Sequence, residues 1–247
     1  IPVWYVDRVK EMERPQYIVD AYFERHKTIL ELPGGQIVDL DTVKNIAKEL
    51  NEFGVILEEG KGLNYSGIDS IVDNKVEYHR IVVPRGGEYN LKLADGTDVW
   101  MFADSEIRFP TRFKGNKREV YLEGEAYFHV TASKEHPFIV KTKDMDVMVT
   151  GTEFNVKAYS DEMNVQTTLL QGVVTVFSGF EKKEKMEIKP NQQAEWCRRS
   201  VKMRVREVDP DLFMAWKNGR FIFRQDRLED IMRTLARWYG VEVVYLD

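Results

Sequence analysis

A glycine followed by a threonine, Gly151-Thr152, is the pair in this sequence best suited to chemistry on the backbone itself. A threonine hydroxyl can attack the carbonyl carbon before it when the peptide bond is distorted and a base lies nearby. Glycine presents that carbonyl without a clash from a Cβ atom. Glu153 is the nearest candidate base. The alternative is architectural, a β-bulge followed by a β-branched strand residue. We favour it because bulges are common at strand irregularities.

The same pair lies where a strand pattern changes register. Apolar side chains fall on odd positions from Met145 to Val149, and on even positions at Phe154 and Val156. Side chains of a strand alternate between two faces, so one extra residue must be absorbed between positions 149 and 154. Gly151 can take that bend. The sequence therefore predicts a bulge or kink there, with or without cleavage of the backbone.

Two carboxylates, Glu123 and Glu125, fall on one face of a predicted strand together with His129. Carboxylates two residues apart lie about 6.5–7 Å apart along a strand, which suits the acid–base chemistry of sugar hydrolysis. We favour instead a solvated strand face, paired with Arg118 or Lys141, because no second catalytic motif accompanies the two carboxylates. The pattern therefore predicts no glycosidase activity.

A basic stripe runs along another predicted strand, with Lys202, Arg204 and Arg206 on one face and Arg198 and Arg199 just before it. Such a stripe could follow a phosphate backbone. No aromatic residue interleaves on that face to stack bases, so a solvated face is the favoured interpretation. The formal net charge of −5 likewise gives no electrostatic case for a nucleic-acid partner.

The composition is that of an ordinary globular protein, with 43% hydrophobic and 31% charged residues among 247. No apolar run approaches the ~18 residues of a membrane span, and no signal peptide is visible. Because the chain begins at Ile1 without an initiator Met, we expect an excised fragment whose targeting segment lies upstream. Cys197 alone forms no internal disulfide, and four histidines with one cysteine show no metal-ligand spacing. Neither a metal nor a cofactor is predicted.

Alternating apolar residues predict a mainly β fold. A β-solenoid or sandwich-like domain is expected over residues 78–208, preceded by an N-terminal segment, 1–77, that leads into it and carries a short helix over 41–50. Four glycines that start successive strands are 28, 27 and 21 residues apart, a spacing that hints at a solenoid: Gly96, Gly124, Gly151 and Gly172.

After a linker near 207–215 the pattern changes to a small C-terminal unit, 209–247. A strand at 220–224, a helix capped by Asp226 and a second strand at 241–245 predict a β-α-β arrangement. The helix is expected to bury one apolar stripe formed by Leu228, Ile231, Met232, Leu235 and Ala236.

The two C-terminal strands are candidate partner surfaces. A terminal strand leaves unpaired N–H and C=O groups, which can accept a strand from another protein or from a second copy of the chain. The alternative is simple internal pairing. The residues assigned to this surface are Arg220, Phe221, Phe223, Val241, Val243 and Tyr245, whereas Trp196, Trp216 and Trp238 are expected in core or interdomain packing.

Long motifs occur in a fixed order over roughly residues 30–247. They are V-P-R-G-G-E-Y at 83–89, L-A-D-G-T-D-V-W at 93–100, R-E-V-Y-L-E-G-E-A-Y-F at 118–128, P-F-I-V at 137–140, G-T-E-F-N-V at 151–156 and W-K-N-G-R-F at 216–221. In these motifs the sequence resembles the FecR family of anti-sigma regulators. The last motif and the helix after it are similar to the family's C-terminal STN-like portion.

The resemblance implies a single-pass protein of the bacterial inner membrane, of which this chain is the periplasmic fragment. In such proteins a cytoplasmic segment holds an ECF sigma factor, and the periplasmic part senses the signalling domain of a TonB-dependent outer-membrane transducer. The resemblance also implies that some members cleave their own backbone at the pair matching Gly151-Thr152. The family's STN-like fold usually carries a second β-α-β half, which is missing from this sequence.

A reading from another class remains, a β-solenoid carbohydrate-binding or glycosidase-like domain. It rests on aromatic residues expected to be exposed beside carboxylates, such as Trp100 and Tyr127, which suit stacking against sugar rings. That reading leaves the C-terminal unit without a role, whereas a signalling module that is not an enzyme, apart from one self-cleavage event, explains it.

Overall fold

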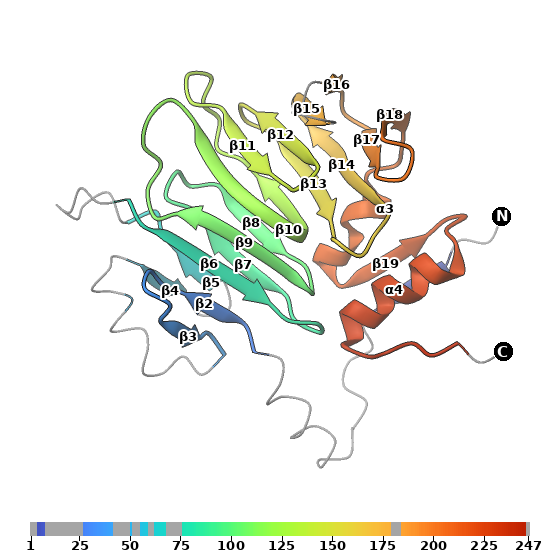
Figure 1. Cartoon of the computed structure of the whole chain (residues 1–247), viewed down its shortest axis with the longest axis horizontal. Coiled ribbons are helices and arrows are strands. Elements are labelled where there is room, and N and C mark those ends of the chain that lie inside the picture. The colour runs from blue at the N-terminus through green and yellow to red at the C-terminus, as the bar shows by residue number, and fades with distance from the viewer. Residues whose placement is uncertain are drawn as a thin grey trace, which may run out of the picture.

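The fold is mainly β, as predicted, with a small C-terminal unit at one side of a broad body of strands (Figure 1). No helix among the described residues has the length and apolar character that crossing a membrane requires. The short helix expected over 41–50 falls almost wholly outside the described residues. The computed structural model describes residues 4–7, 27–41, 50, 55–58, 62–67, 76–178 and 184–245.

The body consists of two sheets whose buried side chains form one apolar core. The first sheet has the order β3 (Ile37–Asp39), β2 (Ile29–Glu31), β6 (Tyr78–Val83), β9 (Ser105–Pro110), β10 (Arg118–His129), β11 (Phe138–Lys141), β12 (Met145–Val149), β15 (Val174–Ser178) and β16 (Glu184–Ile188). The second has the order β4 (Ile56–Glu58), β5 (Gly62–Asn64), β7 (Tyr89–Lys92), β8 (Asp98–Met101), β10, β13 (Glu153–Ala158), β14 (Asn164–Gln171), β17 (Gln192–Cys197) and β18 (Lys202–Glu207).

Strand β10 belongs to both sheets. Its first half pairs with β9 and β11, and its second half, from Gly124 on, pairs with β8 and β13. Gly124 has φ of +96°, and a Cβ atom there would lie 2.6 Å from the Cα atom of Ser105. Only glycine fits such a close approach at positive φ, so this residue lets the strand turn from one sheet into the other.

The kink predicted at Gly151 is confirmed. Strand β12 of the first sheet ends at Val149, and β13 of the second sheet begins at Glu153. Gly151 has φ of +148°, and a Cβ atom there would approach the Cα atom of Ala132 to 2.8 Å. Val149 and Phe154 are nevertheless both buried, so the kink places both apolar sets in the core.

The C-terminal unit consists of α3 (Asp211–Met214), the 3₁₀ turn η4 (Ala215–Asn218), β19 (Arg220–Phe223) and α4 (Leu228–Tyr239). Strand β19 pairs antiparallel with β1 (Trp4–Asp7) from the start of the chain. Helix α4 ends at Tyr239 and is capped by Gly240, which has φ of +61°, and residues 241–245 form no strand. The predicted β-α-β arrangement is therefore wrong in its last element, because the N-terminal strand and not the C-terminal segment pairs with β19.

The apolar stripe of α4 is buried only at its C-terminal end. Ala236 is buried, but Ile231, Met232 and Leu235 are half-buried, and Leu228 is 64% exposed. The expectation of one buried stripe is wrong for the first turns, because the buried residues of α4 are confined to positions 236–238. An apolar surface therefore remains partly open along the start of the helix.

Candidate functional site

The C-terminal unit meets the second sheet through a cluster of aromatic side chains that is separate from the core of the body. Phe102 stacks on Trp238 with ring centroids 5.4 Å apart and meets Phe221 edge-on at 5.9 Å. The expectation that the tryptophans serve packing is confirmed, since Trp196 lies in the main core and Trp216 and Trp238 lie in this cluster. We call this contact the junction.

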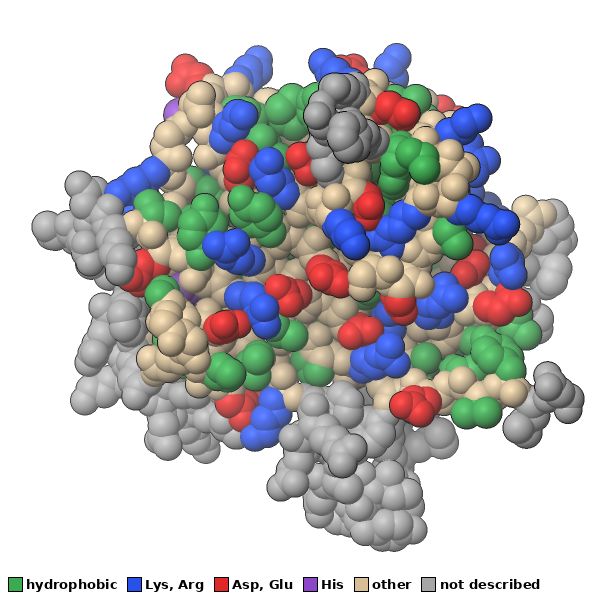
Figure 2. All heavy atoms as spheres, in the orientation of Figure 1, with side chains coloured by type: hydrophobic (Ala, Val, Ile, Leu, Met, Phe, Trp, Pro, Cys, Tyr) green, Lys and Arg blue, Asp and Glu red, His purple; other side chains and the backbone are tan. Residues whose placement is uncertain are grey.

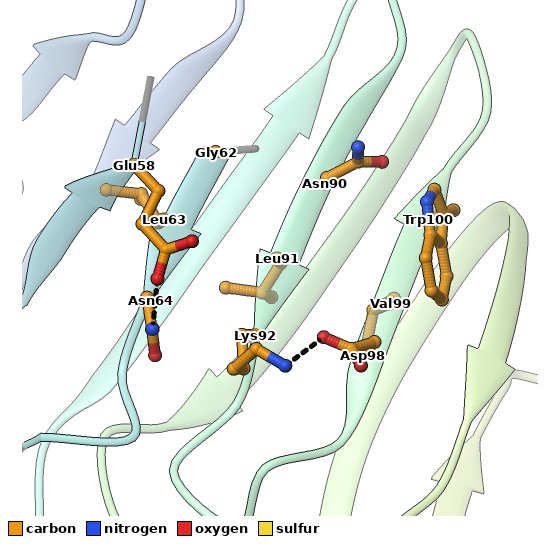
Figure 3. Close-up of a pocket in the computed structure, with 10 residues that line it drawn as sticks. All are labelled: Glu58, Gly62, Leu63, Asn64, Asn90, Leu91, Lys92, Asp98, Val99 and Trp100. Carbon is orange, nitrogen blue, oxygen red and sulfur yellow. Dashed lines mark hydrogen bonds and ion pairs between the residues drawn. The ribbon is translucent and has the colours of Figure 1, made fainter. Parts of the chain in front are cut away.

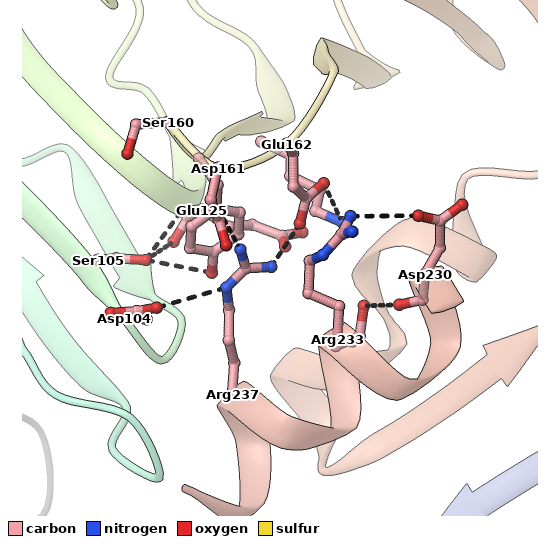
Figure 4. Close-up of polar contacts among 12 residues, drawn as sticks. Asp104, Ser105, Glu125, Ser160, Asp161, Glu162, Asp230, Arg233 and Arg237 are labelled. Carbon is pink, nitrogen blue, oxygen red and sulfur yellow. Dashed lines mark hydrogen bonds and ion pairs between the residues drawn. The ribbon is translucent and has the colours of Figure 1, made fainter. Parts of the chain in front are cut away.

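Arg237, on the last turn of α4, is the most deeply buried charge of the junction, with only 1% of the residue exposed. Its guanidinium carbon lies 3.6 Å from the ring centroid of Tyr159. The guanidinium forms ion pairs with Asp161 and Glu162, and its Nε lies 3.5 Å from Asp104 (Figure 4). A planar guanidinium suits a site that offers both carboxylates and a ring face.

A second cation, Lys217 of η4, lies over two aromatic rings of the body. Its ammonium is 4.0 Å from the ring centroid of Trp100 and 4.1 Å from that of Tyr127. Tyr127 is buried and its hydroxyl donates to Glu153 at 2.8 Å. The expectation of exposed aromatics for sugar stacking is therefore wrong for Tyr127, because a cation covers its ring. We call Lys217 and Arg237, with the rings that they contact, the clasp.

Neither cation of the clasp was identified from the sequence as a functional residue. Arg237 falls outside the apolar stripe of its helix, and Lys217 lies two residues before Gly219 in a turn. The W-K-N-G-R-F motif contains Lys217 and is the one sequence signal that could have directed attention to it. For Arg237 the sequence offers no such signal, since its partners lie about 75 residues or more away.

Glu125 is buried beside the clasp and accepts a hydrogen bond from Asn155 Nδ2 at 2.8 Å. Burial raises the pKa of this carboxyl group above its ordinary value, although the charge of Lys157 opposes the shift. The nearby hydroxyl of Tyr159 donates to the carbonyl of Ala103 at 2.7 Å, and burial raises its pKa as well. This network is enclosed between sheet and helix.

The expectation of a solvated face shared by Glu123 and Glu125 is wrong for Glu125. Glu123 is exposed, but Glu125 lies beyond the bend at Gly124, on the half of β10 that the C-terminal unit covers. The expected basic partners are engaged elsewhere. Arg118 pairs with Asp95 at 2.5 Å, and Lys141 lies 3.8 Å from Glu119 and 3.7 Å from Asp146.

A cleft of about 430 Å³ runs between the second sheet and the C-terminal unit. This volume is within the usual range for a ligand site. Half-buried aromatic and aliphatic side chains line it, among them Phe213, Ile222, Phe223 and Ile231. Charged side chains from both parts also line it, including Glu125 and Glu162.

A smaller cleft of about 190 Å³ lies on β5, β7 and β8 of the second sheet (Figure 3). Its polar groups pair with one another. Lys92 Nζ lies 2.5 Å from Asp98, and Asn64 donates to Glu58 at 2.6 Å. Because these polar groups are paired with one another, we expect them to have a structural and not a catalytic role.

At the Gly151-Thr152 step the threonine hydroxyl donates to the carbonyl of Val173 at 3.2 Å. The carboxylate of Glu153 accepts from Tyr127, as above, and lies 3.6 Å from His129 Nε2. Both groups thus have structural partners, and self-cleavage stays the untested alternative to an architectural role.

The predicted basic stripe is exposed and partly paired. Lys202, Arg204 and Arg206 are exposed on β18, with Arg204 3.7 Å from Glu195. Arg198 differs, because it is half-buried and forms an ion pair with Asp144. Figure 2 shows blue and red side chains intermixed over the visible face instead of one basic patch.

The candidate partner residues lie in different environments. On β19, Arg220 is exposed and Phe223 half-buried, whereas Phe221 is buried in the junction. Of the described strands only β1 pairs with β19, so one edge of β19 has no strand neighbour there. Beyond α4, Val241 and Tyr245 are exposed and Val243 is half-buried.

Comparisons with known proteins match two separate stretches of the chain. Residues 79–175 match the profile of the family described as FecR protein, and residues 220–247 match the profile described as FecR, C-terminal. Two crystal structures, each described as a candidate anti-sigma factor from Parabacteroides distasonis ATCC 8503, are 31% and 32% identical, with TM-scores of 0.63 and 0.62. The matches cover 66% and 65% of this chain and 75% and 74% of the other. Among curated proteins, none matches this chain.

Proposed function

Because this chain belongs to the FecR family, we propose that it is the periplasmic part of a transmembrane anti-sigma regulator. In this proposal the C-terminal unit receives a signal from the signalling domain of a TonB-dependent outer-membrane transducer. The response reaches an ECF sigma factor through a cytoplasmic segment outside this chain. The role is carried out by contact between proteins and requires no catalysed reaction.

The observation that carries this proposal is the clasp. A regulator that works by contact needs a part that meets the partner and a part that responds. Lys217 and Arg237 connect the C-terminal unit with the body, since each comes from that unit and lies over rings of the body. This connection supports the proposal that one part meets the partner and the other responds. Contacts between a cation and a ring have a defined geometry. A partner that binds the C-terminal unit would therefore alter these contacts and the orientation of the unit on the second sheet.

The surface proposed for the partner is β19 with the segment after α4. A strand edge without a neighbour can accept a strand from another protein. Arg220 and Phe223 lie on that strand, and Val241, Val243 and Tyr245 extend the surface beyond the helix. A second copy of the chain could use the same edge, so homodimerisation is the competing outcome in any binding measurement.

Calorimetric titration with a panel of purified transducer signalling domains tests the proposal. We expect one domain to bind the wild-type chain, and Arg220→Glu to weaken that binding at least tenfold. Arg204→Glu is the matched control, since Arg204 is an exposed strand arginine on β18 that does not line the cleft beside β19. Absence of binding to every domain, or equal loss in both variants, would count against the proposal. Sedimentation of the free chain measures its molecular mass and shows whether the chain forms a homodimer without a transducer domain.

A further inference from the structure

The cleft at the junction carries an excess of negative charge. Asp226 and Asp230 are exposed at the start of α4. Of the basic residues in the cleft, Lys157 pairs with Glu162 at 2.9 Å and Arg206 donates to Gln193 at 2.7 Å. The lining contains the carboxylates of Glu125, Glu162, Glu207, Asp209, Asp226 and Asp230 against the bases Lys157, Arg206 and Arg224. Beside the lining, Arg237 pairs with Glu162 and Arg233 lies 3.3 Å from Asp230, which reduces the excess of negative charge but does not cancel it.

The same cleft has an apolar floor that is open to solvent. Ile222 and Phe223 on β19, Phe213 at α3 and Ile231 on α4 are all half-buried. The lining includes every residue from 221 to 226, so the cleft follows the strand. An apolar floor with charged groups beside it is typical of a surface that meets another molecule.

We propose that this cleft binds an extended basic segment of a partner protein. Side chains of an extended peptide alternate between two sides, so apolar residues can lie on the floor while lysine or arginine residues reach the carboxylates. The excess of acidic groups disfavours a nucleic acid or another anion. This inference rests on the proposed function, in which the C-terminal unit meets another protein, and adds the site and the chemistry of the segment.

Glu162 connects this cleft to the clasp. One of its carboxylate oxygens pairs with Arg237 and the other with Lys157, and Glu162 also lines the cleft. A basic side chain entering the cleft competes with Arg237 for the same carboxylate. Binding of the segment therefore loosens the contact between α4 and the body.

Fluorescence polarisation with two labelled peptides tests the proposal on the whole chain. One probe is an octapeptide of alternating valine and lysine, and the other has glutamate in place of lysine. We expect the lysine peptide to bind at least tenfold more tightly. The double variant Asp226→Asn, Asp230→Asn should weaken it at least fivefold. Glu184→Gln, Glu187→Gln is the matched control, since it removes two exposed carboxylates from β16 of the other sheet.

Three outcomes would overturn the assignment: no binding of the lysine peptide, equal affinity for both peptides, or equal loss in the two double variants. The result is separable from the test of the proposed function. If the chain binds a transducer domain but not the lysine peptide, the proposed function is supported and the assignment of the cleft as the binding site is contradicted. If the chain binds the lysine peptide at the cleft but binds no transducer domain, the peptide site is supported and the proposal that the partner is a transducer is contradicted.

Discussion

The core of the body and the junction are held by different kinds of interaction. In the core, Phe128 and Phe154 are fully buried and stack with centroids 5.2 Å apart. The junction also contains stacked rings, but Lys217 and Arg237 lie among them. Apolar burial is non-directional, whereas a buried cation depends on every partner being in place. We therefore predict that the core of the body provides most of the stability, and that the contacts of the junction can be weakened without unfolding the body.

The largest effect is expected from Phe128→Ala in the core. Removal of a fully buried ring leaves a cavity, and the free energy of unfolding should fall by about 3–5 kcal/mol. Denaturant unfolding measures the change. Tyr121→Ala, on an outward-facing position of the same strand, should cost no more than about 1 kcal/mol. Similar losses in both variants would contradict the location of the core.

Arg237→Ala should act on the junction alone. It leaves the carboxylates of Asp161 and Glu162 without their buried partner, and the docking of α4 should weaken by about 3 kcal/mol. Hydrogen exchange should then rise in α4 and remain slow in β10. Arg233→Ala, one turn earlier and partly exposed, should change exchange little. Faster exchange in β10 as well would show that the two regions are not separable.

The body should show its own pH dependence through His79. The ring is buried 2.8 Å from the hydroxyl of Tyr65, and burial lowers its pKa from 6.5 to about 4. The unfolded chain takes up the proton near pH 6.5 and the folded chain only near pH 4. The free energy of unfolding should therefore decrease as the pH is lowered from 6.5 to about 4, by at most about 3 kcal/mol, and should level off below pH 4.

Urea unfolding at a series of pH values measures this dependence. His79→Gln should flatten the curve between pH 6.5 and 4 relative to the wild-type chain. An unchanged slope in that variant would mean that other groups cause the loss of stability with acid.

Lys217→Met should have a small effect, confined to the junction. Methionine keeps much of the side-chain length, so the loss is that of a cation–π contact, about 1 kcal/mol. Lys217→Arg should retain most of the cation–π contact, because it keeps the positive charge. Exchange of amides in η4 is the measurement, and equal behaviour of the Met and Arg variants would show that the charge contributes nothing.

The smallest effect is expected at Gly151-Thr152. If the pair is architectural, the wild-type chain and Thr152→Ala both remain a single band over days of incubation. A fragment that begins at Thr152 in the wild-type chain, and is missing from the variant, would instead establish cleavage.

Local patterns predicted much of the body and little of the junction. The alternation around Gly151 required a kink because a register error would expose Phe154, and the structure has that kink. The burial of Glu125 was missed because the strand alternation gives no sign of a unit packing on it from about 100 residues further on. Pairing of β19 with β1 was missed for a similar reason, since it joins the two ends of the chain.

Hydrogen exchange of the chain with and without a bound transducer signalling domain tests the contact role most directly. Slower exchange is predicted in β19 and beside the cleft, faster exchange in the last turn of α4, where Arg237 contacts the body, and no change in β11 and β12 of the first sheet. Protection confined to the first sheet, or none at β19, would contradict the assignment of the C-terminal unit as the part that meets the partner.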